Sequence, residues 1–217
     1  DVPTFRLEKL TEVNGIGHES AHDAVSDVLA TIDVTRKLRQ AQPKLYDFLF
    51  ELRNKKKVTS QLYPLGKQPV IHISSMYPAA KNCIAIILPI CAHPTNPNGV
   101  ICFDLSQTPD TLLKAGPNEL HRLMFSRKED LAEGETRIAL KTLHINRCPA
   151  IAPIATVKGQ ETRLGLDMEK CMAHLRQLQT ASGVVEKIQD AISQGGFEQH
   201  DDPDLMLYQG EFFSASD

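Results

Sequence analysis

The 217-residue chain has 41% hydrophobic residues, 24% charged residues and a formal net charge of -3 at pH 7, which are ordinary values for a globular protein. This balance excludes a protein coated in positive charge but leaves room for a local basic groove. No apolar run approaches the roughly 18 residues that cross a bilayer, and no signal peptide opens the sequence. Five cysteines without a CxxC spacing argue against zinc ribbons and a disulfide framework, and favour a reducing cytoplasm.

The first predicted element is an amphipathic helix over residues 20–41. Ser20 and Asp23 form an S-x-x-D capping box at its start, and Pro43 lies just past its end. Apolar residues recur at helical spacing along it: Ala24, Val25, Val28, Leu29 and Ile32. A second, shorter helix is predicted for residues 44–53.

The chain then changes to short β-branched segments bounded by Pro, Asn and Gly, which are typical of strands. The NPNG sequence between the second and third of these segments is a hairpin signal. The strands are expected within residues 69–77, 82–94 and 99–105, with one or two more around residues 138–145. Short strands at this spacing predict a small antiparallel barrel or curled sheet.

Helices interrupt and follow the sheet, so the predicted fold class is α+β. They are expected within residues 110–125 (with a Gly-Pro break), 129–134, 168–179 and 183–194. We divide the chain into residues 1–42, residues 43–194 and an acidic, Gly-rich linker over residues 195–217. The first part is too short to own a core, and the first residue is not Met, so we expect it to be the end of a domain that starts upstream.

His22 and Asp27 are candidate catalytic residues at the start of the first helix. Five residues advance a helix by about 7.5 Å, so the two side chains can flank one cation. The Asp27 carboxylate suits Mg²⁺ or Mn²⁺, and the His22 imidazole can take a proton from a metal-bound water. On spacing alone the stronger interpretation is an ordinary helix start with Asp27 on a solvated face. His18 is interpreted as a loop residue ahead of the cap.

The sequence HDAVSD (residues 22–27) has the H-x-A-x-x-D form. It resembles the last motif of the DEDD-type 3′→5′ exonucleases, in the subclass with a histidine. Its surroundings are more specific, because residues 5–57 resemble the end of the nuclease domain of the bacterial exodeoxyribonuclease I family. The segments PVIHISSMY, CAHPTNPNGVICFDL, KTLHINRCPAIAP, ETRLGLD and LYQGEFF follow in that family's order. The resemblance covers nearly the whole chain.

The resemblance implies a clamp around single-stranded DNA. In such a clamp a ribonuclease-H-like DEDD nuclease domain removes nucleotides from the 3′ end, an SH3-like domain closes over the strand, and a helical domain completes the ring. By motif match, Asp27 would be a metal ligand and His22 the general base that activates water. The implied reaction is Mg²⁺- or Mn²⁺-dependent, processive degradation of single-stranded DNA to mononucleotides in DNA repair and recombination, with two metals stabilising the attacking and leaving oxygens.

Two motifs of that family's site are absent from this sequence: the early D-x-E and the middle Asp. We therefore expect an incomplete two-metal site and no exonuclease activity from the isolated chain. Asp167-Met168-Glu169 does spell D-x-E, but it follows the histidine motif and precedes an amphipathic helix. We interpret it as a helix-start pair, because acidic residues favour a helix N-terminus.

A basic cluster between the predicted helices and the sheet is the candidate DNA contact. It could neutralise several phosphates, with an affinity that falls steeply with salt. Its residues are Arg53, Lys55, Lys56 and Lys57, with Lys67 and Lys81 nearby. Tyr63, Tyr77 and Phe103 are the candidate aromatic surfaces for base stacking. The alternative is a solvated helix end.

Other function classes remain open. The AHDA and QHDD sequences contain His-Asp pairs like those of HD-type phosphohydrolases, although that fold is all-helical. A non-catalytic module that binds single-stranded DNA or a protein is the more serious alternative, and it is our expectation for the isolated chain. The resemblance also implies docking to the single-stranded-DNA-binding protein through its acidic, hydrophobic C-terminal tail. We expect a monomer in the bacterial cytoplasm, without membrane contact.

Overall fold

The computed structural model describes residues 4–18 and 23–194. Within them, the centre of the molecule is a five-stranded antiparallel sheet with the strand order β4-β3-β2-β1-β5. The strands are β1 (Val70–Ile73), β2 (Ile84–Ala92), β3 (Gly99–Asp104), β4 (Leu140–His144) and β5 (Ala150–Pro153). The predicted strand segments and the α+β fold class are therefore confirmed, and β5 follows β4 as a separate strand.

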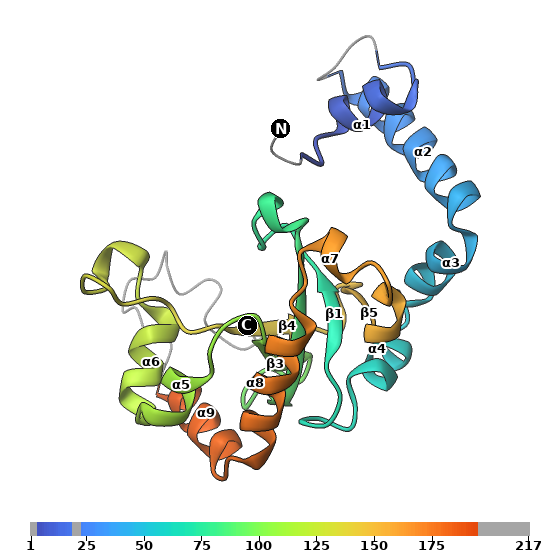
Figure 1. Cartoon of the computed structure of the whole chain (residues 1–217). Helices are drawn as coiled ribbons and strands as arrows, with labels where there is room; N and C mark the ends of the chain where they lie inside the picture. The colour runs from blue at the N-terminus through green and yellow to red at the C-terminus, as the bar shows by residue number, and fades with distance from the viewer. Residues whose placement is uncertain (1–3, 19–22, 195–217) are drawn as a thin grey trace, which may run out of the picture.

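Helices flank the sheet in sequence (Figure 1). Before it come α1 (Leu7–Asn14), α2 (Ala24–Ala41), α3 (Pro43–Glu51) and α4 (Lys55–Leu62). Between β3 and β4 lie α5 (Asp110–Lys114) and α6 (Pro117–Phe125), and after β5 come α7 (Glu161–Leu164), α8 (Met168–Thr180) and α9 (Val184–Ser193). The sequence did not predict α1, α4 or α7 as helices, and the segment at 129–134 holds only part of a short 3₁₀ turn, Lys128–Asp130.

Both faces of the central strands β2 and β3 are buried, which is consistent with the nearly continuous apolar sequence of β2. Successive residues of a strand point to opposite faces. Ile86 and Leu88 of β2 therefore join the core that includes α8 and α9, while Ala85 and Ile87 join a second core with residues of α4. Every residue of β2 except Ala92 is buried. A strand covered on both sides loses the apolar-polar alternation of a half-exposed strand.

Two histidines, the buried His174 and the half-buried His121, link the helices on one face of the sheet to other backbone segments. Nδ1 of His174 in α8 lies 2.8 Å from the carbonyl oxygen of Leu105, and Nδ1 of His121 in α6 lies 2.8 Å from that of Ala191 in α9. Because a carbonyl only accepts hydrogen bonds, each Nδ1 carries a proton and donates it.

The first two helices lie away from the sheet, and α3 connects them to it (Figure 1). One side of α2 faces α1, where Ala30 is only 1% exposed. The predicted apolar stripe occupies the opposite side and is open to solvent, with Val25 67%, Val28 57%, Leu29 57% and Ile32 40% exposed. Among the described residues, no helix has the length and apolarity needed to cross a membrane.

Candidate metal and nucleic-acid site

The helix that carries Asp27 begins at Ala24, so the predicted start at Ser20 is wrong. Asp23 is the N-cap: its backbone is extended, and its carboxylate accepts a hydrogen bond from the backbone N–H of Ser26 at 2.9 Å. Aspartate is among the best N-cap residues, and here it caps the helix by itself instead of closing a box from the first turn. Ser20 and His22 lie outside the described residues. The cap leaves Asp27 in the first turn of α2.

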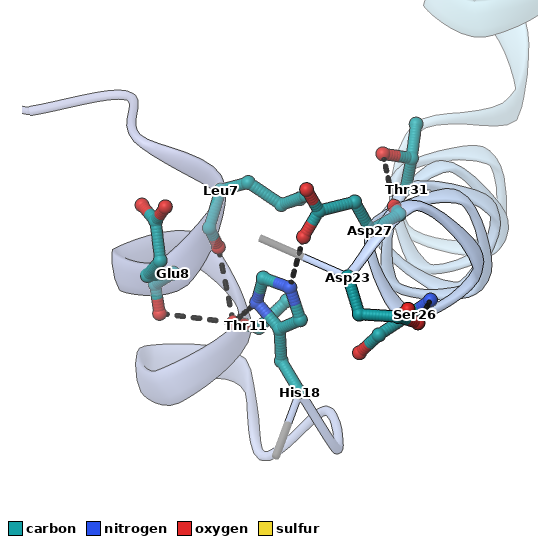
Figure 2. Close-up of polar contacts among 8 residues, drawn as sticks. All are labelled: Leu7, Glu8, Thr11, His18, Asp23, Ser26, Asp27 and Thr31. Atoms are coloured by element: carbon teal, nitrogen blue, oxygen red, sulfur yellow. Dashed lines mark hydrogen bonds and ion pairs between the residues drawn. The ribbon is translucent and has the colours of Figure 1, made fainter. Parts of the chain in front are cut away.

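Asp27 contacts His18, a residue that was not among the predicted site residues. His18 does lie in a loop, but its Nε2 is 2.7 Å from Oδ1 of Asp27 (Figure 2). Its Nδ1 lies 3.4 Å from the hydroxyl oxygen of the buried Thr11 on α1. No sequence pattern signals this contact, because it depends on how α1 packs against α2.

The described residues supply a candidate metal ligand but not a complete metal site. The Asp27 side chain is 41% exposed, and its carboxylate oxygens are the hard donors that Mg²⁺ and Mn²⁺ prefer. Within residues 4–18 and 23–194, no three His, Cys, Asp or Glu side chains come together in a group that could hold a metal ion. Asp27 therefore fits such an ion as one ligand, and further ligands have to come from elsewhere.

Asp167 and Glu169 belong to the start of α8. Asp167 is the N-cap, and its carboxylate accepts a hydrogen bond from the backbone N–H of Lys170 at 2.9 Å. The interpretation of this D-x-E sequence as a helix-start pair is confirmed.

Three lysines of the basic cluster form the first turn of α4. Asn54 caps the helix by accepting a hydrogen bond from the backbone N–H of Lys56 at 2.9 Å. Lys55 donates to the side-chain oxygen of Asn98 at 2.6 Å, and Lys57 pairs with Glu51 at 3.1 Å. The first turn contains no acidic residue. Lysines next to the positive end of the helix dipole raise the local positive potential and disfavour the helix.

The structure does not bring Lys81 to the lysines of α4. Lys81 ends the 3₁₀ turn before β2, whereas Lys55 contacts Asn98 in the turn after β2. Eight steps of about 3.3 Å along β2 put roughly 25 Å between these two ends of the strand. The candidate basic residues are thus split between two ends of the sheet, and a single phosphate cannot touch both groups.

Of the three aromatic residues predicted to stack on bases, Phe103 does not fit, and that prediction is wrong. It is 1% exposed because β3 lies between two covered faces, so no base can reach its ring. Tyr63 is 47% exposed, and its ring is accessible. Tyr77 is half-buried: its hydroxyl lies 2.9 Å from Nδ1 of His72, and the Lys141 ammonium lies 4.6 Å from its ring centre.

Tyr77 and Lys141 line a hollow of about 440 Å³ beside β4. Arg137, Met76 and Asp104 also contribute to its wall. Burial, reinforced by the positive charge of Lys141, lowers the pKa of His72, the hydrogen-bond partner of Tyr77, to about 4. Burial also lowers the pKa of Lys141 itself. Nothing in the sequence indicates this hollow, because its residues are far apart along the chain and come together only in the fold.

The five-stranded antiparallel sheet, with helices packed on both faces of its central strands, places the chain in the class of SH3-like modules with helical additions. A family model described as the exonuclease I SH3-like domain matches residues 53–194. The chain belongs to the exonuclease I family.

Its relatives are longer than the chain itself. The chain is 37% identical over 219 residues to Exodeoxyribonuclease I of Haemophilus influenzae, a match that covers 100% of this chain and 46% of the relative. It is 35% identical over 218 residues to Exodeoxyribonuclease I of Escherichia coli K12, again covering 100% and 46%. The chain thus spans about half the length of these relatives.

Solved structures of exonuclease I have the same fold. Exonuclease I from Methylocaldum szegediense is 42% identical with a TM-score of 0.85, covering 96% of this chain and 43% of that one. Escherichia coli exonuclease I in complex with a dA16 oligonucleotide is 35% identical with a TM-score of 0.88, covering 100% and 46%. The Escherichia coli complex with single-stranded DNA has also been solved in zinc-bound and metal-free forms.

Proposed function

We propose that this chain is the DNA-clamping SH3-like part, with the adjoining end of the nuclease domain, of an exodeoxyribonuclease I that degrades single-stranded DNA from its 3′ end to mononucleotides. The observation that carries the proposal is the match of the entire chain to Exodeoxyribonuclease I sequences. We place the complete protein, meaning this chain with the rest of the nuclease domain and a helical domain, in DNA repair and recombination in the bacterial cytoplasm, as a monomer. The proposed domain division is residues 1–42, 43–194 and 195–217.

In this proposal residues 22–27 contribute half of the catalytic centre. Asp27 would hold a Mg²⁺ or Mn²⁺ ion, which supplies positive charge to the attacking and leaving oxygens of the phosphodiester. His22 would take the proton of the attacking water. Asp27 is exposed in the first turn of α2, as a ligand that meets a metal from solvent has to be. The remaining carboxylates would come from the part of the nuclease domain that this sequence does not include.

The first turn of α4 is the best-supported phosphate contact. Three consecutive lysines oppose the helix dipole there, so they cost helix stability instead of adding to it. Residues that break a local stability rule are expected at functional sites. Arg53 precedes this turn, with its guanidinium 4.0 Å from the centre of the Phe50 ring. Lys81 would contact a different nucleotide of the same strand, at the far end of β2.

The exposed apolar stripe of α2 supports the view that residues 1–42 belong to a larger domain. Apolar stripes of this kind on soluble proteins usually lie against another element. We propose that the rest of the nuclease domain covers it.

We also propose the single-stranded-DNA-binding protein as a partner, bound through its acidic, hydrophobic C-terminal tail. Titration of that tail peptide into the chain tests whether the docking surface lies here, and absence of binding would place it on the other domains.

Degradation of 5′-labelled single-stranded DNA in the presence of Mg²⁺ tests the catalytic proposal. The complete protein should shorten the DNA from its 3′ end, and D27N should abolish this activity without unfolding the protein. The isolated chain should leave the DNA intact. Processive degradation by the isolated chain would contradict the proposal that it holds only part of the catalytic centre.

The alternative function, a non-catalytic module for single-stranded DNA, is favoured for the isolated chain by its complete SH3-like core. Binding of fluorescent oligo-dT to the isolated chain, measured at several salt concentrations, tests this alternative. The combined charge reversal K55E/K56E/K57E should weaken DNA binding at low salt and flatten the salt dependence, in the chain and in the complete protein. An unchanged salt slope would count against the phosphate contact.

A further inference from the structure

We infer that His18 is a positioning residue for Asp27: its buried imidazole holds the carboxylate in the orientation in which it ligates the divalent cation. This inference rests on the proposed function, in which Asp27 is a metal ligand. It adds a residue outside the H-x-A-x-x-D motif to the catalytic centre.

Burial separates the roles of the two side chains. His18 is 4% exposed at its side chain and Asp27 is 41% exposed, although their nearest atoms are 2.7 Å apart. A cation that arrives from solvent therefore meets the carboxylate, while the imidazole lies between α1 and α2 (Figure 2). This burial does not fit a direct ligand or a general base, but it fits a residue that orients a ligand.

The hydrogen-bond chemistry fixes the direction of the contact. An ionised carboxylate only accepts, so Nε2 of His18 is the donor and Oδ1 of Asp27 the acceptor. On the other side of the ring, Nδ1 lies 3.4 Å from the Thr11 hydroxyl, which itself lies 3.0 Å from the carbonyl oxygen of Leu7. Thr11 is 1% exposed. The imidazole thus lies against a buried hydroxyl at Nδ1 and presents Nε2 to the exposed carboxylate.

A carboxylate held in this way remains able to bind a metal. Its two oxygens together accept about four hydrogen bonds or ligand contacts, so one bond from His18 does not exhaust them. Partners that orient ligating groups typically account for about 10- to 100-fold in metal affinity or activity. We expect an effect of this size for His18, because its buried imidazole contacts a carboxylate that is 41% exposed in the first turn of α2.

A purely structural role for His18 has to be separated from this one. The His18–Asp27 contact also links the loop after α1 to α2, and its loss could simply loosen the helix pair. Lys37 on α2 offers a matched control, because its ammonium donates to the carbonyl oxygen of Asn14 at 2.5 Å. That bond joins the same two helices without touching Asp27.

The experiment compares H18L, H18Q and K37M in the complete protein. Leu keeps bulk but has no donor, whereas the side-chain amide of Gln reaches the position of Nε2. Three quantities are measured: the Mn²⁺ dissociation constant by calorimetry, the Mg²⁺ concentration that half-saturates DNA degradation, and the melting temperature. H18L should raise both metal values about 10- to 100-fold. H18Q should recover most of the loss, and K37M should leave both metal values at wild type even if it lowers the melting temperature.

If the wild-type protein shows metal-dependent degradation, three outcomes would overturn this inference and leave the proposed function in place. The first is an H18L variant that binds Mn²⁺ as wild type does. The second is a K37M variant that loses as much metal affinity as H18L, which would leave only helix docking. The third is an H18Q variant no better than H18L. A wild-type protein without metal-dependent degradation would instead overturn the proposed function, and the inference with it.

Discussion

At the scale of single residues, burial decides what each titratable side chain contributes. His72 lies in β1 and is 5% exposed, and its Nδ1 is hydrogen-bonded to the Tyr77 hydroxyl. The Lys141 ammonium lies close to the Tyr77 ring. Burial, reinforced by the positive charge of Lys141, lowers the pKa of His72 from 6.5 to about 4. The folded chain therefore holds His72 neutral at pH values at which the unfolded chain protonates it.

This difference predicts an acid-sensitive step in stability. Between pH 6.5 and pH 4 the unfolded state binds more protons than the folded state, so the free energy of unfolding falls as the pH falls. The full loss from this histidine is on the order of 3 kcal/mol. Urea unfolding of the wild type and of H72L/Y77F, which removes both partners of the bond, measures it. Identical pH dependences in the two proteins would show that His72 is not the cause.

Lys56 gives a residue-scale test that separates DNA binding from stability. Replacing it by Glu puts an acidic residue next to the positive end of the α4 dipole, where it is favourable by about 0.3–1 kcal/mol. K56E should therefore keep or raise the unfolding free energy while it weakens binding to oligo-dT and reduces the salt slope by about 1 to 2. A variant that binds DNA as wild type does would remove Lys56 from the phosphate contact.

At the scale of elements, strands and capped helices were predictable, and contacts between distant elements were not. The β-branched segments and the NPNG turn identify β1 to β3, and Asp167 marks the start of α8. The eight-residue helix α1 was missed because isolated helices of that length carry little intrinsic stability. Because the contact of His18 with Asp27 depends on α1, it was not predictable either. Phe103 was misjudged because the alternation in β3 does not reveal that both faces are covered.

The two aspartate caps provide an element-scale prediction. Asp23 and Asp167 make equivalent N-cap hydrogen bonds of 2.9 Å, but α8 packs into the main core and α2 does not. In the isolated chain, D167A should lower the free energy of unfolding by about 1 kcal/mol. D23A should instead raise hydrogen exchange in α2 and leave the main unfolding transition in place. Equal shifts of that transition would mean that α2 folds with the core as one unit.

At the scale of the whole molecule, α2 is a helix with one packed side and one open side. Ala30 faces α1 and is 1% exposed, whereas Val28 on the opposite side is 57% exposed. Burying a valine side chain contributes about 1.5–3 kcal/mol to stability. The exposed apolar stripe therefore does not contribute the stabilising free energy that its burial would provide. The rest of the nuclease domain would supply that gain in the complete protein.

V28K distinguishes the isolated chain from the complete protein. In the chain the lysine replaces an exposed side chain, so the free energy of unfolding should change by no more than about 0.5 kcal/mol. In the complete protein it would have to be buried under the added domain, and the loss should reach about 2 kcal/mol or more. Q40K adds the same charge at another exposed position of α2 and should be neutral in both. If V28K is equally mild in the complete protein, the stripe is not the surface on which the nuclease domain is completed, and α2 has to face that domain through its α1 side or its ends.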